Sequence, residues 1–484
     1  MSTIVVAGNG PAAHRLARQL RRRGHRGALT LVGAEPAPAY NRALLGSVLD
    51  GALRPRQLTL PALPDDVRVL TGTRITSVDR AHRVAHTDDG CRLPYDTLVL
   101  ATGARPRIPE VPGVRTVSGA LSEGVRTVRT AADCGPAVEG PVVVLGGGVL
   151  GVETALALRR AGHETALVHP SAHPMDDHLD ATAGAMLTER LTSRGVLVHL
   201  GRSAVQYLPG KLLLDDGQVL GASTLLLCTG TTPDTELAAS CGLAVREGVL
   251  VDGLLRTDDP FVHAIGDCAS FPGAPHGSLT HAWEQADALA RILTESPSTP
   301  YRPGGRSLRL RSPGTDVLVL GRPGDDADGT VPFDETVSFV DRAGGRYARL
   351  VLRGGRVGHG VLLGLSPAVA AVSRLYDGDV PLPPDRLALL LGRDDGYADE
   401  AEPPDHLVVC HCNNVTRKDL TDAFHQGAHD VAALAGATRA TTGCGSCASV
   451  VRALCATLGR RADDRSRSGE ESRVDDERQG STPP

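Results

Sequence analysis

Two stretches, IVVAGNGPAAHRLARQL (residues 4–20) and VVVLGGGVLGVETALALRRA (residues 142–161), decide the fold. Each runs from a short apolar segment through a glycine-rich turn into a helical pattern, and a second apolar segment follows each helix. In this order of strand, turn and helix, a dinucleotide pyrophosphate can lie against a helix N-terminus. Two such units in one chain predict an α/β fold with two Rossmann-like dinucleotide-binding domains.

The two units differ in the residue that follows their second strand. In the first, Gly8, Gly10 and Ala13 form a GxGxxA turn, and Glu35 lies near the expected spacing of about 20 residues. An acid there is typical of a group that binds ribose hydroxyls. The second unit ends at His169 instead of an acid, so the sequence leaves the choice between NADH and NADPH open.

Three further strand ends carry weaker signals. The runs LVLATGARP (residues 98–106) and LLLCTGTTP (residues 225–233) both leave an apolar strand through Thr-Gly, which taken alone is typical of a tight turn. The run FVHAIGDCA (residues 261–269) ends in Gly266 and Asp267. A carboxylate at the end of a strand can bind a cofactor hydroxyl or simply stabilise a turn.

Composition excludes several other classes of protein. At 484 residues, with 41% hydrophobic and 22% charged residues and a net charge of -5, the chain predicts several globular domains. Acids balance its arginines, so we do not expect it to bind nucleic acid. It shows no basic leader and no apolar run near the roughly 20 residues of a membrane span, which predicts a cytoplasmic protein that does not bind membranes.

Four of the ten cysteines form two close pairs near the C-terminus. Cys410 and Cys412 lie in a CHC motif, and Cys444 and Cys447 lie in a CGSC motif. In a reducing compartment such pairs indicate a metal or redox site rather than disulfides. Four thiolates suit either zinc or an iron–sulfur cluster, and spacing alone does not choose between them.

The order of these motifs resembles a known superfamily. The GxGxxA turn with Glu35, ATG at 101–103, GGGVLG at 146–151 with Glu153, and AIGD at 264–267 are similar to reductases of the pyridine nucleotide-disulfide oxidoreductase superfamily, over residues 1 to about 300. The disulfide-reducing branch needs a CxxxxC motif near the first helix. Residues 30–60 hold none, so disulfide reduction is disfavoured.

Other motifs narrow the resemblance. YNRALL (residues 40–45), LVHPSAHPMDDHLD (residues 167–180) and HAWEQA (residues 281–286) resemble the flavoprotein part of assimilatory nitrite reductase large subunits and assimilatory nitrate reductase electron-transfer subunits. CHCNNVTRKDL (residues 410–420), followed by CGSC, resembles the bacterioferritin-associated-ferredoxin type of [2Fe–2S] domain. Iron also suits a position behind a flavin, because zinc does not change oxidation state.

The resemblance implies the architecture in detail. It predicts a discontinuous FAD-binding domain, an NAD(P)-binding domain, a small α+β interface domain and a small helical [2Fe–2S] domain. The implied boundaries are 1–115 and 236–300 for the FAD-binding domain, 116–235 for the NAD(P)-binding domain, 301–392 for the α+β domain, 393–405 for a linker, 406–460 for the [2Fe–2S] domain and 461–484 for a disordered tail.

Individual residues receive roles in the same way. We expect FAD, NAD(P)H and a [2Fe–2S] cluster as cofactors, with Glu153 and Trp283 as candidate catalytic residues near the flavin and nicotinamide. The residues expected to bind the dinucleotides are Gly8, Gly10, Pro11, Ala12, Glu35, Arg42, Ala101, Thr102, Gly103, Gly146, Gly148, Gly151, Glu153, His169, Gly230, Gly266, Asp267 and Trp283; the expected cluster ligands are Cys410, Cys412, Cys444 and Cys447.

These expectations define one main hypothesis for function and its alternatives. The main hypothesis is an assimilatory nitrate reductase electron-transfer subunit that passes electrons from NAD(P)H through FAD and the cluster to a catalytic subunit. The alternatives are an electron donor to nitrite reductase, a stand-alone reductase for ferredoxin- or rubredoxin-type carriers, and a redox-sensing or scaffold protein. A flexible linker would let the cluster domain swing between flavin and acceptor. Homo-oligomerisation stays open.

Overall fold

The computed structural model of the chain describes most of its residues. These are residues 2–461 apart from 136–137, 273–276, 278, 306, 311, 313, 322–334, 392–404, 406, 411–412, 414 and 444–446. Two of the expected cluster ligands, Cys412 and Cys444, therefore lie outside the described residues. So do residues 393–404 of the expected linker and residues 462–484 of the expected tail.

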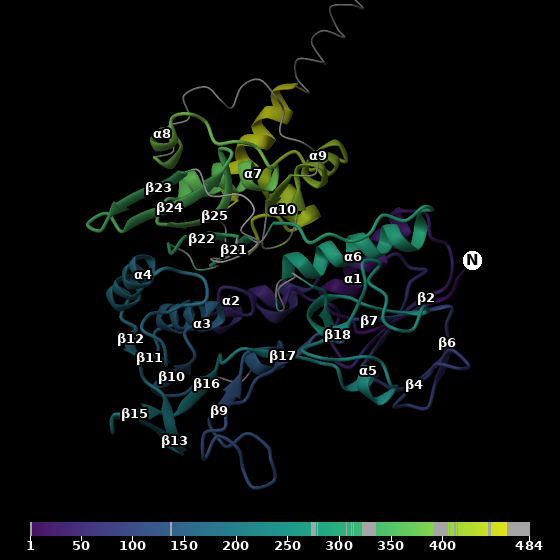
Figure 1. Ribbon diagram of the computed structural model, residues 1–484, viewed down its shortest axis with the longest axis horizontal. Helices are drawn as coiled ribbons and strands as arrows, with labels where there is room; N and C mark the ends of the chain where they lie inside the picture. The colour runs from purple at the N-terminus through teal and green to yellow at the C-terminus, as the bar shows by residue number, and fades with distance from the viewer. Residues whose placement is uncertain are drawn as a thin grey trace, which may run out of the picture.

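The first sheet is parallel and has the strand order β19-β7-β1-β2-β3. Its last strand in sequence, β19, comes from a segment far from the other four. The helices α1 and α6 pack side by side against it (Figure 1). Because other elements pack against this sheet, its central strands are continuous apolar runs rather than alternating apolar and polar residues. The elements are β1 (Ile4–Ala7), α1 (Pro11–Arg22), β2 (Leu29–Gly33), β3 (Arg68–Thr71), β7 (Thr97–Leu100), β19 (Val262–Ala264) and α6 (Leu279–Thr294).

The second sheet repeats this plan with the order β12-β11-β10-β16-β9, again parallel. A three-stranded antiparallel sheet, β13-β14-β15, packs beside it. The elements are β9 (Val125–Thr127), β10 (Val142–Leu145), α3 (Val149–Arg160), β11 (Thr165–His169), α4 (Ala181–Ser193), β12 (Leu197–Leu200), β13 (Ala204–Leu208), β14 (Gly210–Leu214), β15 (Val219–Ala222) and β16 (Thr224–Leu227).

The two halves are joined where the two Thr-Gly exits meet. β8 (Ala104–Pro106) pairs with β17 (Thr231–Pro233) in antiparallel register, and the Thr102 hydroxyl donates to the Asp234 carbonyl at 2.6 Å. The two segments that follow the Thr-Gly turns thus form a two-stranded antiparallel ribbon that connects the two halves. The remaining elements of this part are η1 (Arg42–Leu44), α2 (Gly46–Leu49), η2 (Pro55–Leu58), β4 (Ile75–Asp79), β5 (Val84–Thr87), β6 (Arg92–Pro94), η3 (Ala132–Cys134), α5 (Glu236–Ser240), β18 (Val249–Leu250), η4 (Gly266–Cys268) and β20 (Ala269–Ser270).

A smaller unit follows, as expected for an α+β domain. Its five-stranded antiparallel sheet has the order β21-β22-β25-β24-β23, and α7 packs on β22 and β25. Its own apolar cluster includes Leu350, Leu362 and Val369, all fully buried. The elements are β21 (Ser307–Arg309), β22 (Val317–Leu320), β23 (Glu335–Asp341), β24 (Arg346–Arg353), β25 (Arg356–Leu363), α7 (Ser366–Asp377) and α8 (Arg386–Leu390).

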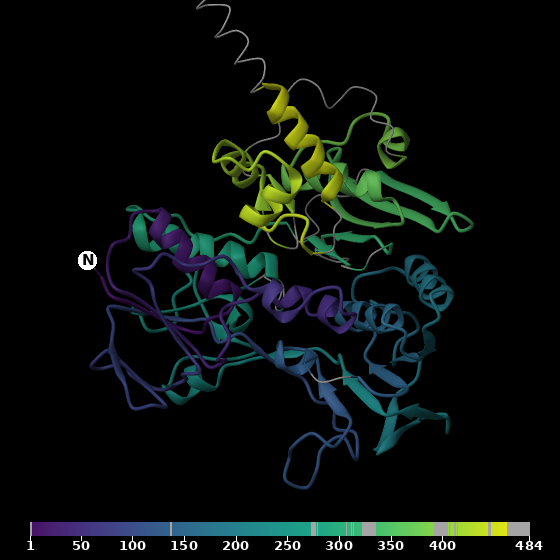
Figure 2. The same cartoon turned by 180° about the vertical axis from the view of Figure 1, so that it is seen from behind.

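The C-terminal unit is small and mostly helical. It contains β26 (Val408–Cys410), β27 (Val415–Thr416), α9 (Arg417–His425), α10 (Val431–Thr438) and a last helix over residues 448–461. Seen from both sides, it lies beside the β21–β25 unit and above α1 and α6 (Figure 2). Thr416 and Asp419 form a capping box at the start of α9, shortly after the first cysteine pair.

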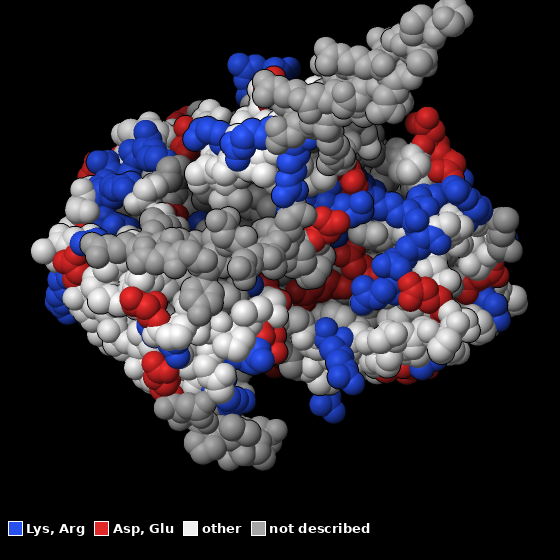
Figure 3. All heavy atoms as spheres, turned by 90° about the horizontal axis from the view of Figure 1, so that it is seen from above, with Lys and Arg blue, Asp and Glu red and all other residues white. Residues whose placement is uncertain are grey.

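This arrangement confirms the expected fold class. Among the described residues, we find no helix with the length and apolar character that crossing a membrane requires. On the face seen from above, Lys and Arg side chains lie among Asp and Glu (Figure 3).

Candidate dinucleotide and iron–sulfur sites

A cavity of about 2080 Å³ lies between the two parallel sheets. Both glycine turns line it, as do the strand exits at Ala101–Gly103, at Gly230 and at Gly266–Asp267. In α/β proteins, ligands bind at the carboxyl ends of parallel strands. The cavity is therefore where two dinucleotides can meet.

The first glycine turn is shaped for close approach. Gly8 has φ +132°, and a Cβ there would lie 2.1 Å from the Ala101 carbonyl oxygen. Gly10 precedes α1, and a Cβ added there would meet no atom within 4 Å. No side chain caps the helix. The first N–H groups of α1 are thus left for a ligand. An uncapped helix N-terminus beside a cavity fits the pyrophosphate of FAD.

Glu35 is held by two neighbours from the YNRALL segment. The Tyr40 hydroxyl donates to Glu35 Oε2 at 2.6 Å, and the Arg42 guanidinium bonds to the other carboxylate oxygen. Burial raises the pKa of Tyr40 well above its usual range, so its phenol stays protonated and can donate. The carboxylate is fixed beside the cavity, in the position expected for a ribose-binding acid.

Asp267 is connected to the same network by Arg129. The Arg129 guanidinium donates to Asp267 Oδ2 at 2.6 Å and to the Ala104 carbonyl at 3.1 Å. Its own carbonyl accepts a hydrogen bond from Arg42 at 3.2 Å. Sequence reasoning missed Arg129, because one arginine in an arginine-rich chain carries no local signal. Gln285 was also missed, although its side chain accepts the Gly266 N–H at 2.7 Å, because that contact joins residues 19 apart in sequence.

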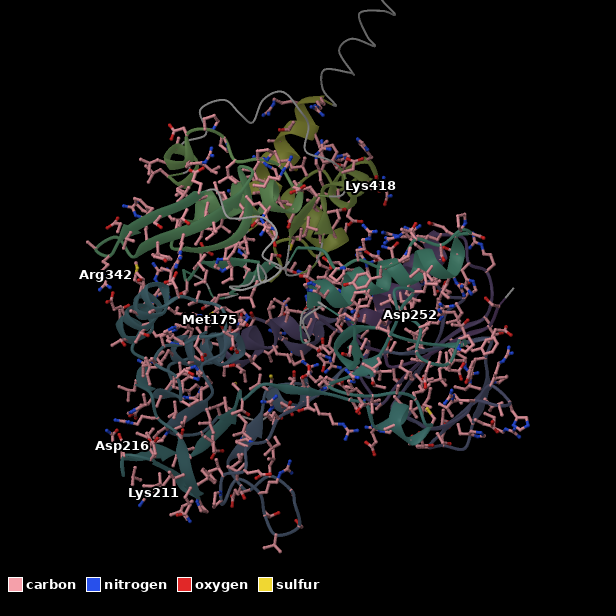
Figure 4. The ribbon with its side chains drawn as sticks, in the orientation of Figure 1. Met175, Lys211, Asp216, Asp252, Arg342 and Lys418 are labelled. Atoms are coloured by element: carbon pink, nitrogen blue, oxygen red, sulfur yellow. The ribbon has the colours of Figure 1, made fainter. Side chains whose placement is uncertain are left out.

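The second glycine turn is held by the segment that follows β11. The Gly147 N–H donates to His169 Nδ1 at 3.1 Å, which leaves the proton on Nε2 to donate to Asp176 at 2.9 Å. The Met175 N–H donates to the Gly147 carbonyl at 2.8 Å. Met175 is buried with φ +55°, and Figure 4 places it inside this half of the molecule. These bonds fix the turn around His169.

The start of α3 matches the start of α1. Gly146 has φ +109°, and a Cβ there would lie 2.4 Å from the Cys228 carbonyl oxygen. Gly148 precedes α3, and a Cβ added there would meet no atom within 4 Å. This helix also has no side-chain cap. Glu153, one turn further along, is 9% exposed and lines the cavity. This turn fits the pyrophosphate of a nicotinamide dinucleotide.

The structure brings most of the expected dinucleotide-binding residues to one cavity. Gly151 and Trp283 lie outside its lining. A Cβ on Gly151 would lie 1.8 Å from the Gly146 carbonyl oxygen, so this glycine allows α3 to approach the turn. The side chain of Trp283 is 6% exposed, in the second turn of α6. The expected residues that do line the cavity are Gly8, Gly10, Pro11, Ala12, Glu35, Arg42, Ala101, Thr102, Gly103, Gly146, Gly148, Glu153, His169, Gly230, Gly266 and Asp267.

Two of the four expected cluster ligands are described. Cys410 ends β26 and is fully buried, and Cys447 is 5% exposed just before the last helix. Both belong to one apolar cluster with Leu420 and Phe424. The described residues contain no group of three metal-binding side chains, since Cys412 and Cys444 fall outside them. The segments that carry both cysteine pairs thus share one buried core, which fits a shared cluster.

Other buried cysteines have a different character. Burial raises the pKa of Cys134 and of Cys228 to about 12. These thiols stay protonated at neutral pH, which is typical of cysteines that pack a core.

The C-terminal unit packs against the wall of the dinucleotide cavity. The apolar cluster that contains Cys410 and Cys447 continues into Tyr40, Leu45 and Leu58. At the edge of this contact, Arg22 lies 3.6 Å from Asp419, and the Arg439 guanidinium donates to the Gln57 carbonyl. The cysteine-bearing unit is therefore docked beside the segment that holds Glu35.

Two dinucleotide turns on one cavity, with a docked cysteine unit, agree with two family models: the protein is an FAD-dependent NAD(P)H oxidoreductase with a [2Fe–2S] domain. A family model described as pyridine nucleotide-disulphide oxidoreductase matches residues 2–288, and the chain belongs to this family. A second model, described as a BFD-like [2Fe-2S] binding domain, matches residues 408–456.

Individual relatives agree with this assignment. The assimilatory nitrate reductase electron transfer subunit of Bacillus subtilis is 29% identical over 93% of this chain and 59% of its own length. The nitrite reductase [NAD(P)H] of the same organism is 28% identical over 94% of this chain and 58% of its own. The chain thus spans less than two thirds of these relatives. The crystal structure of the covalent putidaredoxin reductase-putidaredoxin complex matches with a TM-score of 0.70 and 25% identity, over 81% of this chain and 95% of that one.

Proposed function

We propose that this protein carries electrons from NAD(P)H to the catalytic subunit of an assimilatory nitrate reductase, by way of FAD and a [2Fe–2S] cluster. The observation that carries the proposal is the docking of the cysteine unit beside the cavity wall, where the Arg439 guanidinium donates to the Gln57 carbonyl and Arg22 pairs with Asp419. Electron transfer requires proximity, and this contact supplies it within one chain.

The residues of the cavity have separate tasks in this proposal. The turns at Gly8 and Gly10 with Glu35 and Asp267 would hold FAD, and those at Gly146 and Gly148 with Glu153 and His169 would hold the nicotinamide dinucleotide. The four cysteines at 410, 412, 444 and 447 would hold the cluster. Bound flavin supplies the conversion between a two-electron hydride donor and one-electron acceptors.

The same geometry suits other acceptors, and the relatives favour two of them. A partner nitrite reductase is the first alternative, since a nitrite reductase is among the similar proteins. A small iron–sulfur carrier is the second, because the matching putidaredoxin reductase is joined to putidaredoxin in its crystal structure. We place the nitrate reductase subunit first because the relative of that name is itself an electron transfer subunit and matches 93% of this chain at 29% identity.

The test is an anaerobic titration with defined acceptors. The purified protein is assayed for iron and zinc and titrated with NADH and with NADPH, while its visible and electron paramagnetic resonance (EPR) spectra are recorded. We expect flavin bleaching, followed by the signal of a reduced [2Fe–2S] cluster. Each candidate acceptor is then mixed with the reduced protein, and the proposed subunit should reoxidise it fastest.

The matched control is Cys447→Ala, which removes one proposed cluster ligand and leaves both glycine turns unchanged. It should keep flavin bleaching and lose the EPR signal. Zinc in place of iron, or a cluster that stays oxidised under excess NADH and NADPH, would overturn the proposed electron route.

A further inference from the structure

The side chain of Asn41 has a fixed orientation at the docked interface. Asn41 is 1% exposed, and its Oδ1 accepts the Ala43 N–H at 3.1 Å. Because a backbone N–H can only be met by the oxygen of the amide, Nδ2 must point the other way. That nitrogen donates to Asn413 Oδ1 at 3.1 Å, across the contact between the dinucleotide-binding part and the C-terminal unit.

Asn413 is oriented just as firmly at its other end. Its Nδ2 donates to the Arg439 carbonyl at 2.8 Å and to the Thr442 hydroxyl at 3.3 Å. In sequence, Asn413 directly follows Cys412, and Thr442 lies two residues before Cys444. One amide side chain therefore ties together the segments that carry the two cysteine pairs.

The second of these segments needs such a tie. Arg439 and Thr441 have φ values of +69° and +66°, in the left-handed region that residues with a Cβ rarely adopt. Backbone in this region persists where surrounding bonds hold it. The Thr442 hydroxyl adds a bond to the Arg439 carbonyl at 2.8 Å, and the Arg439 guanidinium reaches the Gln57 carbonyl.

The other end of the chain of bonds lies at the cavity. Asn41 stands between Tyr40 and Arg42, the two residues that hold Glu35. Its N–H also donates to the Leu58 carbonyl at 2.9 Å, so its backbone is fixed on both sides. The hydrogen bonds thus run without a break from the cavity wall to both cysteine segments.

We propose that Asn41 is a positioning residue, which sets the geometry of the cysteine segments through Asn413 and aligns them with the dinucleotide cavity. The proposal deepens the proposed function and rests on it for its kinetic consequence only. Replacing the Nδ2 donor with an acceptor removes the bond to the half-buried Asn413 side chain and sets two acceptor oxygens against each other. The cysteine segments should then loosen although Asn41 belongs to another part of the molecule.

The variant that isolates this bond is Asn41→Asp. It keeps the oxygen that accepts the Ala43 N–H, while it replaces the donor to Asn413 with an acceptor. The matched control is Arg22→Gln, which removes the ion pair with Asp419 at the edge of the same interface, away from residues 439–443. Thr442→Val is a second variant, which removes the hydroxyl at the far end.

Hydrogen exchange provides the direct readout. We expect backbone amides of residues 439–443 to exchange at least ten-fold faster in Asn41→Asp than in the unchanged protein, and within two-fold of it in Arg22→Gln. Combining Asn41→Asp with Thr442→Val should add little further, because both act on one chain of bonds. Unchanged exchange in Asn41→Asp, or equal effects in Arg22→Gln, would overturn the proposal. If Asn41→Asp does not fold, Asn41→Ser, which keeps a side-chain oxygen for the Ala43 N–H and lacks the donor to Asn413, decides by the same measure.

Kinetics separates this proposal from the proposed function. In stopped-flow mixing with NADH, the rate of cluster reduction divided by the rate of flavin reduction should fall at least ten-fold in Asn41→Asp. If NADH fails to reduce the cluster even in the unchanged protein, the proposed function is lost. The exchange measurement then still decides whether Asn41 positions the cysteine segments. If exchange becomes faster but the kinetic ratio does not change, Asn41 does not align these segments with the dinucleotide cavity.

Discussion

At the scale of single residues, the site depends on side chains that fix one another. His169 shows this most clearly: its ring accepts a bond from Gly147 and donates one to Asp176, so it holds the glycine turn and orients a carboxylate at once. Burial opposes ionisation of Asp176, but hydrogen bonds from Ser171 and His169 outweigh it and lower the pKa of Asp176. The carboxylate is therefore charged at neutral pH, beside the turn proposed to bind the nicotinamide dinucleotide.

This charge predicts a preference for NADH over NADPH, since a carboxylate repels a ribose phosphate. We expect Asp176→Asn to raise the ratio of kcat/KM for NADPH to that for NADH about ten-fold, equivalent to about 1.4 kcal/mol. The control is Asp216→Asn, at the outer edge of the same half of the molecule (Figure 4), where Asp216 pairs with Arg202. An equal change in both variants, or none in Asp176→Asn, contradicts the prediction.

Glu284 provides a prediction about stability. Burial raises the pKa of Glu284 to about 7, although the hydrogen bond from the Gly304 N–H lowers it. The negative charges of Asp377 and Asp287 raise the pKa further. Because the folded pKa lies above the unfolded value of 4.5, stability is full below pH 4.5 and is lost as pH rises to about 7. Glu284→Gln should remove this loss and stabilise the protein at pH 8 by up to about 3 kcal/mol.

Thermal unfolding from pH 5 to pH 8 checks this expectation. The melting temperature of Glu284→Gln should exceed that of the unchanged protein increasingly as pH rises. Glu295→Gln is a suitable control, because Glu295 pairs with Arg23 near the end of the same helix, half-exposed. A constant difference across the pH range would show that Glu284 does not titrate in this way.

At the scale of elements, patterns that are local in sequence predicted the structure well. The strands at 4–7 and 142–145 occur as expected, because runs of Val, Ile and Leu before glycine turns have few other stable conformations. The capping box at Thr416 is equally local, since its two residues are three apart. The role of Gly151 was not, because its need for a small residue arises from the Gly146 carbonyl on the facing turn.

That contact yields a prediction about α3. Gly151→Ala places a methyl group 1.8 Å from the Gly146 carbonyl oxygen, which is backbone and cannot rotate away. The helix must shift from the turn, so we expect KM for NADH to rise at least ten-fold, with a loss of stability of about 1–3 kcal/mol. Gly436→Ala in α10, where a Cβ meets nothing within 4 Å, should leave KM unchanged. Steady-state kinetics with an artificial dye would measure both.

At the scale of the whole molecule, the order of the domains was readable but their contacts were not. Nothing near Asn41 in the sequence indicates a bond to Asn413, and nothing near Arg129 indicates Asp267, because these pairs form only when distant segments fold together. The structure shows the cysteine unit docked on the cavity wall, whereas the expected linker lies outside the described residues. Swinging of this unit toward an acceptor therefore stays a prediction.

Locking the docked unit in place tests whether reduction of the cluster and delivery of electrons to an outside acceptor need different positions of this unit. Cysteines introduced by Arg22→Cys and Asp419→Cys, joined by a bifunctional reagent that spans the space of the two replaced side chains, would hold α9 against α1, where the Arg22 guanidinium and the Asp419 carboxylate lie 3.6 Å apart. The docked contact already places the cysteine segments at the cavity wall, so reduction of the cluster by NADH should keep its rate within two-fold. Delivery to an outside acceptor should slow at least ten-fold, because Cys410 and Cys447 are almost fully buried in the docked unit. The same variant without the reagent is the control, and undiminished delivery by the locked protein would mean that the acceptor binds the docked form directly.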